Sequence, residues 1–250
     1  IDFLVSGYDA TENANVVIIE LKQWEGDSTE RVEARDGIVK TALGGGLRET
    51  PHPSYQAASY AQLLSDFNTT VRERPIDLHP LAYLHNFEAQ HRETLDNDLY
   101  RPYIEQAPLY IRGDAKKLRA FLESQIDVGD DGENLYEMNK GKIRPAKSLQ
   151  NSLLEMLEDQ DEFTLIDSQK VVFEKAVELA DRSRRDGQKR TLIVDGGPGT
   201  GKTVVAINIL AELIQNDMVA QYVSKNRAPR EVYKEKLRGD KLVKEIEHLF

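Results

Sequence analysis

The fold is decided by residues 191–203, TLIVDGGPGTGKT, in which a short apolar run leads into a glycine-rich turn that ends in Lys202 and Thr203. The turn fits the pattern G-x-x-x-x-G-K-[ST] in full. Glycines let the backbone turn so that successive N–H groups point at a phosphate, while a lysine ammonium sits between the β- and γ-phosphates and a threonine hydroxyl ligates magnesium. The stretch therefore predicts a phosphate-binding loop, with ATP and Mg²⁺ as the expected cofactors and Mn²⁺ as the alternative metal. The residues assigned to this loop are Gly196, Gly197, Pro198, Gly199, Thr200, Gly201, Lys202 and Thr203.

The segments around the loop predict a βαβ unit, which is the building block of a parallel sheet. No apolar strand ending in Asp-Glu follows the loop, so the sequence favours nucleotide binding over hydrolysis. Residues 148–250 are accordingly expected to be the start of a P-loop NTPase domain of the RecA-like kind. The predicted elements are helices over Ser148–Leu157 and Ser168–Arg185, a buried strand over Thr191–Asp195, an apolar helix over Lys202–Gln215 and a strand over Val219–Ser224.

Composition describes an ordinary globular chain of 250 residues with a formal net charge of -10. No apolar run approaches the roughly 20 residues of a membrane helix, so no membrane partner is expected. The absence of cysteine and of a signal peptide favours a cytoplasmic setting. From Gly187 onward eleven Lys/Arg oppose eight Asp/Glu, a net of +3 that leaves -13 for the preceding residues. Any contact with nucleic acid should therefore be local.

The N-terminal part predicts a separate mixed α/β domain over residues 1–126. Its first segments predict a β-hairpin, with strands over Ile1–Ser6 and Val16–Trp24. A helix over Ser54–Phe67, a strand over Ile76–Leu84 and a helix over Asp114–Ile126 are expected to follow. Residues 127–147 are interpreted as a linker, because Asp127–Lys142 is acidic, holds three glycines and shows no periodicity.

The hairpin brings two carboxylates together. A turn centred on Thr11 pairs residue i with residue 22 minus i, which places Asp2 directly opposite Glu20 with Cβ atoms about 5 Å apart. Like charges that close repel unless a cation lies between them, and a hard divalent ion with oxygen ligands is the natural occupant. Lys22 shares the face of Glu20 and is suited to orient a water or help deprotonate it.

This arrangement resembles the D…(D/E)-x-K core of the PD-(D/E)XK nuclease superfamily. Gln56 and Tyr60 are similar to the Q-x-x-x-Y helix motif of its RecB-like branch, and their i, i+4 spacing puts them on one helix face. The resemblance implies that Asp2, Glu20 and the backbone carbonyl of Leu21 bind the metal and that Lys22 assists the attacking water. It also implies that Gln56 and Tyr60 arrange the site or the DNA strand. Among the histidines, only His52 is placed near this site.

Two further stretches resemble superfamily 1 helicases. Gln169, in LIDSQ upstream of the loop, is similar to the Q motif, and a glutamine amide can pair with the N6 and N7 edge of adenine. After the second predicted strand, Lys225, Arg227 and Arg230 stand where such helicases contact a single strand, and these residues are suited to neutralise phosphates. A solvent-facing glutamine and a solvated basic loop are the alternative interpretations.

The segments IELKQW, HPSYQAASYAQLL, the Gln169 helix, GGPGTGKT and YVSKNRAPREVY together resemble the Schlafen group 3-like DNA/RNA helicase family. The resemblance implies a PD-(D/E)XK nuclease-like domain fused to a superfamily 1 helicase or ATPase. Nucleic acid, with DNA preferred over RNA, is the implied partner. Since the chain opens inside a strand pattern and stops soon after the second predicted strand, we expect it to be a fragment cut at both ends.

The leading hypothesis is an ATP-dependent nuclease-helicase. Its N-terminal domain would carry out metal-dependent phosphodiester hydrolysis, and its C-terminal domain would be an ATP-driven motor. One alternative is a nucleotide-regulated nucleic-acid-binding protein whose nuclease fold is inactive. Another is a P-loop ATPase that does not act on nucleic acid, with the hairpin carboxylates purely structural. The intact set of Asp2, Glu20 and Lys22 argues against the first alternative, and the basic cluster argues against the second.

Overall fold

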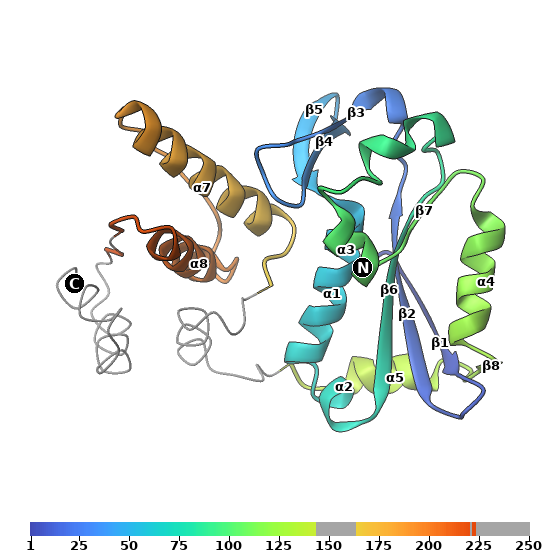
Figure 1. The fold of residues 1–250 in the computed structure, drawn as a ribbon. Coiled ribbons are helices and arrows are strands. Elements are labelled where there is room, and N and C mark those ends of the chain that lie inside the picture. Colours follow the sequence, from blue (N-terminus) through green and yellow to red (C-terminus); the bar gives the residue numbers. More distant parts are fainter. Residues whose placement is uncertain (144–163, 221, 224–250) are drawn as a thin grey trace. The chain divides into compact units, whose positions relative to one another are not determined.

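A computed structural model describes residues 1–143, 164–220 and 222–223 (Figure 1). The chain divides into two compact units. Unit 1 comprises Ile1–Ala146 together with Ile166–Val171, and unit 2 comprises Lys147–Leu165 and Val172–Phe250. No helix in the described ranges is both long enough and apolar enough to cross a membrane.

Unit 1 is built on a mixed five-stranded sheet, in which β2 is the central strand and lies between β6 and β1. The strand order is β7-β6-β2-β1-β8, with β1 and β2 antiparallel and β2 and β6 parallel. Unit 1 is therefore a mixed α/β structure, as the sequence predicts. The strands are β1 (Phe3–Tyr8), β2 (Ala14–Lys22), β6 (Ile76–Leu84), β7 (Leu109–Ile111) and β8 (Val128–Gly129).

A short turn sets the register of the β1–β2 hairpin. The Asp9 side chain accepts hydrogen bonds from the backbone N–H groups of Thr11 and Asn13, at 2.8 and 2.9 Å, and Glu12 adopts a left-handed backbone with φ of 63°. The paired residues run from Phe3 opposite Ile19 to Tyr8 opposite Ala14. Every pair sums to 22, so the predicted register is confirmed.

Strand β2 is buried on both faces because helices cover both sides of the sheet (Figure 1). Alternation sends Val17 and Ile19 toward α4, where they pack with Leu118 and Phe121. The even-numbered residues of β2 face the other side, which α1 covers together with α2 and α5. The helices of unit 1 are α1 (Pro53–Phe67), α2 (Thr69–Glu73), α3 (Arg101–Gln106), α4 (Ala115–Gln125) and α5 (Glu133–Lys140).

A second, smaller sheet precedes α1. It is antiparallel with the order β3-β4-β5, and buried Val39 of β4 packs with Trp24 and Leu84 in one apolar cluster. The strands are β3 (Thr29–Arg31), β4 (Ile38–Leu43) and β5 (Gly46–Pro51), and two short 3₁₀ helices are η1 (Gly26–Ser28) and η2 (Ala89–Thr94).

The segment predicted as a linker is structured over residues 127–142. Strand β8 pairs with the end of β1, and α5 buries Met138 against Val16, Val71 and Ile76. The linker prediction is corrected here: the acidic, glycine-containing composition hid a short helix whose apolar side chains pack on the sheet.

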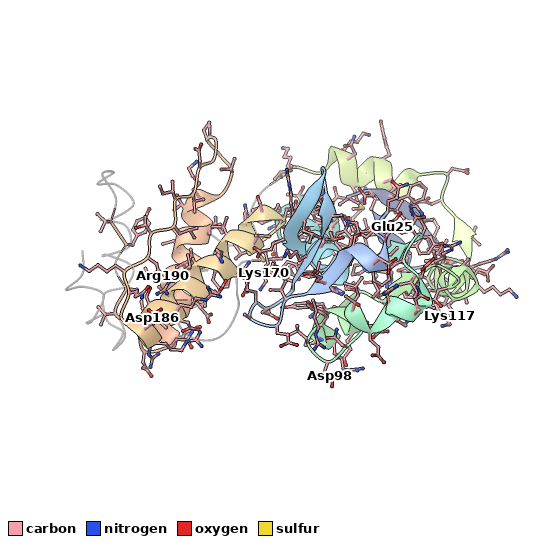
Figure 2. All side chains as sticks on the ribbon, turned by 90° about the horizontal axis from the view of Figure 1, so that it is seen from above. Glu25, Asp98, Lys117, Lys170, Asp186 and Arg190 are labelled. Carbon is pink, nitrogen blue, oxygen red and sulfur yellow. The ribbon has the colours of Figure 1, made fainter. Side chains whose placement is uncertain are left out.

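Unit 2 contains most of α7 (Ser168–Asp186) and the whole of α8 (Lys202–Gln215), both close to the predicted helices. Figure 2 shows Asp186 beside Arg190, and the two side chains form an ion pair of 2.5 Å at the end of α7. The helix predicted over Ser148–Leu157 lies outside the described residues.

The two strands predicted on either side of α8 are not strands in the structure. Residues 191–195 have no strand geometry and Ile193 is 86% exposed, and the described residues within 219–224 likewise form no strand. The parallel βαβ prediction is therefore wrong for the described part of unit 2. A strand exists only where a neighbouring strand completes its hydrogen bonds, and neither segment has such a neighbour among the described residues.

We expect Met138→Ala to lower the free energy of unfolding by about 2–5 kcal/mol, because it leaves a cavity under α5. Urea unfolding of the full chain measures this. Asn139→Ala, at an exposed neighbouring position, is the matched control and should change stability by less than about 0.5 kcal/mol. An equally small effect of Met138→Ala would show that α5 does not belong to the core.

Candidate functional site

The hairpin places the predicted carboxylates side by side at the open end of β1 and β2. Continuing the observed register by one residue sets Asp2 opposite Glu20. The backbone N–H of Leu21 donates to Asp2 Oδ2 at 2.9 Å, which holds the Asp2 carboxylate against β2. The structure therefore brings Asp2, Glu20 and Leu21 together as the sequence predicts.

Glu20 is a buried carboxylate, with 2% of the residue exposed. Lys22 Nζ lies 2.5 Å from Glu20 Oε1, and this lysine also stands over the Trp24 ring at 5.7 Å. Glu20 Oε2 is buried and has no hydrogen-bond partner among the described residues. A buried carboxylate oxygen without a partner is costly, and a cation, a proton or a hydrogen-bond donor would offset that cost.

The electrostatics of Glu20 follow from this burial. Burial raises the pKa of Glu20 above its usual range, the Lys22 ammonium opposes that rise, and the neighbouring Asp2 charge adds to it. The site therefore destabilises its own ionised state. A divalent cation beside both carboxylates would reverse this effect.

Helix α1 presents Gln56 and Tyr60 on one face, one turn apart. Gln56 Nε2 donates to Tyr60 Oη at 2.9 Å and to Asp167 Oδ1 at 2.8 Å, and Tyr60 Oη donates to the same Asp167 oxygen at 2.9 Å. Burial raises the pKa of Tyr60, and the charges of Asp167 and Glu20 raise it further. The predicted Gln56–Tyr60 pair is thus formed, and it lies within electrostatic reach of Glu20.

His52 has a structural place in the same helix. It is fully buried as the N-cap of α1, where Nδ1 accepts from the Ser54 N–H at 3.2 Å and Nε2 contacts the Leu95 carbonyl oxygen at 3.0 Å. Its ring stacks on Tyr100 with centroids 4.5 Å apart. Burial lowers the pKa of His52 to about 4, so the ring is neutral at physiological pH. His52 therefore caps the helix that carries Gln56.

A metal ion between Asp2 and Glu20 would have few protein ligands. Within the described ranges, no group of three or more His, Cys, Asp or Glu side chains is placed to hold a metal ion. The two carboxylates of Asp2 and Glu20 and the Leu21 carbonyl are the oxygen donors at the end of the hairpin. Mg²⁺ in proteins is often held by one or two carboxylates with water or substrate oxygens completing the shell, so this donor set fits that ion.

The phosphate loop leads directly into α8. Gly199 and Gly201 have φ of 76° and 81°, a left-handed conformation that side-chain-bearing residues rarely adopt. Gly201 is the N-cap of α8 and offers no side-chain acceptor to the first turn, while Thr203 is exposed. The first N–H groups of α8 are thereby available to an anion.

Lys202 folds back over the loop. Its Nζ donates to the carbonyl oxygens of Gly196 and Gly197 at 2.7 and 2.5 Å, and the Thr200 hydroxyl donates to the Gly197 carbonyl at 2.9 Å. These bonds hold the Lys202 side chain against the glycine-rich turn. All of residues 191–200 are exposed.

Gln169 lies in the first turn of α7. Its side-chain Oε1 accepts from the Ile166 N–H at 3.3 Å, and its own N–H donates to the Ile166 carbonyl at 2.9 Å. Its role in adenine recognition stays a prediction. Lys225, Arg227 and Arg230 lie outside the described residues.

Sequence reasoning missed Asp167, which stands next to the predicted Gln169 helix but received no role. Its contacts with Gln56 and Tyr60 span 111 and 107 residues. The only local signal is its position just before a helix, which usually indicates a capping residue.

Residues 189–250 match the family model described as Schlafen group 3, DNA/RNA helicase domain. The chain is thus a mixed α/β protein whose C-terminal part is similar to that helicase domain. The predicted resemblance is confirmed over this range, and the match does not reach the preceding residues. No curated protein and no solved structure matches the chain.

We expect Glu20→Gln to have a larger free energy of unfolding than the parent protein, and we expect this difference to grow as pH rises. The raised pKa of Glu20 means that the folded state favours the protonated carboxyl, so stability is present below the ordinary value of 4.5 and is lost as pH rises through the folded pKa. The variant should therefore exceed the parent protein in free energy of unfolding at pH 8 in EDTA, with a smaller difference at pH 5.

Urea unfolding at the two pH values measures this, with the exposed Glu105→Gln as control. A difference between parent and Glu20→Gln that is equal at both pH values, or opposite in sign, would contradict the burial argument.

Proposed function

We propose that this chain combines a metal-dependent nuclease site in unit 1 with an ATP-binding helicase-type segment in unit 2, and that it acts on nucleic acid, DNA in preference to RNA. The observation that carries the nuclease part is the buried Glu20 carboxylate, whose Oε2 lacks a partner while Asp2 and Lys22 stand beside it. The helicase part is supported by the family match over residues 189–250 and by the geometry of the phosphate loop.

In this proposal Asp2, Glu20 and the Leu21 carbonyl hold Mg²⁺ or Mn²⁺, which when bound supplies Lewis acidity at the scissile phosphodiester. Lys22 is held against Glu20 Oε1 by the ion pair and is placed to orient the attacking water. Its ammonium also offsets negative charge near the reacting phosphate. Glu20 therefore binds the cation with one oxygen and positions Lys22 with the other.

Gln56 and Tyr60 are proposed to contact the nucleic-acid backbone. The Gln56 amide and the Tyr60 hydroxyl present two donors on one face of α1, and both converge on a single acceptor oxygen. An unesterified phosphate oxygen is an acceptor of the same kind as the carboxylate oxygen they now hold.

The ATP site is proposed at the loop between residues 196 and 203. The backbone N–H groups at the start of α8 would hold the phosphates, and the Thr203 hydroxyl would ligate the magnesium that accompanies ATP. Lys202 would exchange its bonds with the Gly196 and Gly197 carbonyls for the phosphate oxygens. Gln169 is proposed to select adenine.

Cleavage of labelled DNA by the purified chain in Mg²⁺ or Mn²⁺ should fall by at least about 100-fold in Glu20→Gln, because the metal loses a charged ligand while the shape of the side chain is kept. The control Glu105→Gln should cleave like the parent protein. Undiminished cleavage by Glu20→Gln would place the activity elsewhere.

Lys202→Ala should weaken ATP binding by about 10- to 150-fold in calorimetry, the loss expected when a charged hydrogen-bond donor to phosphate is removed. Since the Lys202 side chain is exposed, the melting temperature should stay unchanged. Lys189→Ala, at an exposed lysine outside the loop, is the control. Equal affinity in Lys202→Ala and the parent would exclude this loop as the nucleotide site.

A further inference from the structure

Asp167 accepts hydrogen bonds from two donors on α1, Gln56 and Tyr60, although it lies more than a hundred residues away in the sequence. It lies in the segment Ile166–Val171, which belongs to unit 1. Its Oδ1 alone accepts from both Gln56 Nε2 and Tyr60 Oη, at 2.8 and 2.9 Å.

The geometry of this contact is that of an anion site. Two donors on neighbouring turns of one helix face converge on one oxygen, and they can hold only one strong acceptor at a time. A carboxylate oxygen and a phosphodiester oxygen are both anionic acceptors that form short, charge-assisted bonds. Asp167 and a nucleic-acid backbone would therefore compete for Gln56 and Tyr60.

The contact is made at a local cost. Asp167 has a left-handed backbone with φ of 46°, and Gln56 Oε1 is buried without a hydrogen-bond partner among the described residues because the amide turns its nitrogen toward Asp167. Strained backbone and unpaired buried polar atoms both offset the gain from hydrogen bonds. These costs favour release when another acceptor arrives.

Geometry argues against a role for Asp167 as a metal ligand. Among the described residues, no three His, Cys, Asp or Glu side chains are placed to hold one metal ion, so Asp167 does not join Asp2 and Glu20 around one ion. It instead adds a negative charge near the Tyr60 hydroxyl, where a phosphate would otherwise lie.

The segment is held at a second point. Lys170, labelled in Figure 2, pairs with Asp36 at 3.0 Å between Nζ and Oδ2 and stands over the Tyr55 ring at 5.1 Å. Tyr55 precedes Gln56 on α1, so both anchors of the segment meet the same end of that helix.

We propose that Asp167 is an autoinhibitory carboxylate that occupies the phosphate position on Gln56 and Tyr60, and that nucleic acid must displace it to enter the candidate nuclease site. This inference rests on the proposed function, since it assigns the regulation of the same site.

The test is binding of a fluorescein-labelled single-stranded DNA to the full chain in EDTA, where metal-dependent cleavage cannot proceed. Asp167→Ala should bind about five- to tenfold more tightly than the parent, the gain expected when a competitor held by two hydrogen bonds is removed. Asp167→Asn, which keeps the shape but not the charge, should lie between them. Ser168→Ala, at the exposed neighbouring position, is the matched control and should bind like the parent.

A double variant distinguishes loss of the competing carboxylate from a general effect of removing one negative charge on DNA binding. The gain should disappear when Gln56→Ala is added to Asp167→Ala, because the donor pair is then broken; a gain that persists would overturn the competition. Asp36→Ala provides an independent variant, since it removes the Lys170–Asp36 ion pair at the second anchor and should also tighten binding. Should Asp167→Ala fail to fold, Asp167→Asn and Asp36→Ala decide the matter.

Cleavage in Mg²⁺ by the same proteins distinguishes the two proposals. Tighter binding by Asp167→Ala without cleavage by any variant would overturn the nuclease proposal and leave the autoinhibition standing. Equal or weaker binding by Asp167→Ala, with cleavage by the parent intact, would overturn the autoinhibition alone.

Discussion

The burial of one carboxylate, Glu20, constrains the structure around it. Strand β2 is hydrogen-bonded to β1 on one side and to β6 on the other, so Glu20 cannot move out of the sheet to reach water. Strand alternation directs its side chain toward α1. That helix buries Ala57 and Ala61, and it carries the hydrogen-bonded pair Gln56 and Tyr60. A buried charge requires a partner, and Lys22 supplies one to Glu20 Oε1 while Oε2 has none among the described residues.

A separate polar cluster on α1 joins segments that are far apart in the sequence. Lys22 pairs with one oxygen of Glu20, while Gln56 and Tyr60 both donate to Asp167. The segment Ile166–Val171 belongs to unit 1, and α7 continues into unit 2. Helix α7 thus contains residues of both units.

Local patterns predicted the hairpin register and the Gln56–Tyr60 pair, because alternation and i, i+4 spacing are properties of one or two neighbouring elements. Strands on either side of α8 were predicted from the same kind of apolar run, and that prediction was wrong because a strand also needs a partner. Asp167 could not be assigned from sequence, since its partners lie more than a hundred residues away. Helix α5 was missed because its composition is acidic and only Met138 and its apolar neighbours reveal the packing face.

The length of the turn at Asp9 sets the register that pairs Asp2 with Glu20, although the turn lies far from both residues. It lies at the far end of β1 from Asp2, about 20 Å away at the rise of an extended strand. One residue added to or removed from that turn would shift the pairing by a single position, setting Asp2 opposite a residue on the other face of β2. Both carboxylates would remain in the chain after such an insertion or deletion but would no longer face each other, so the length of this turn fixes the pairing of Asp2 with Glu20.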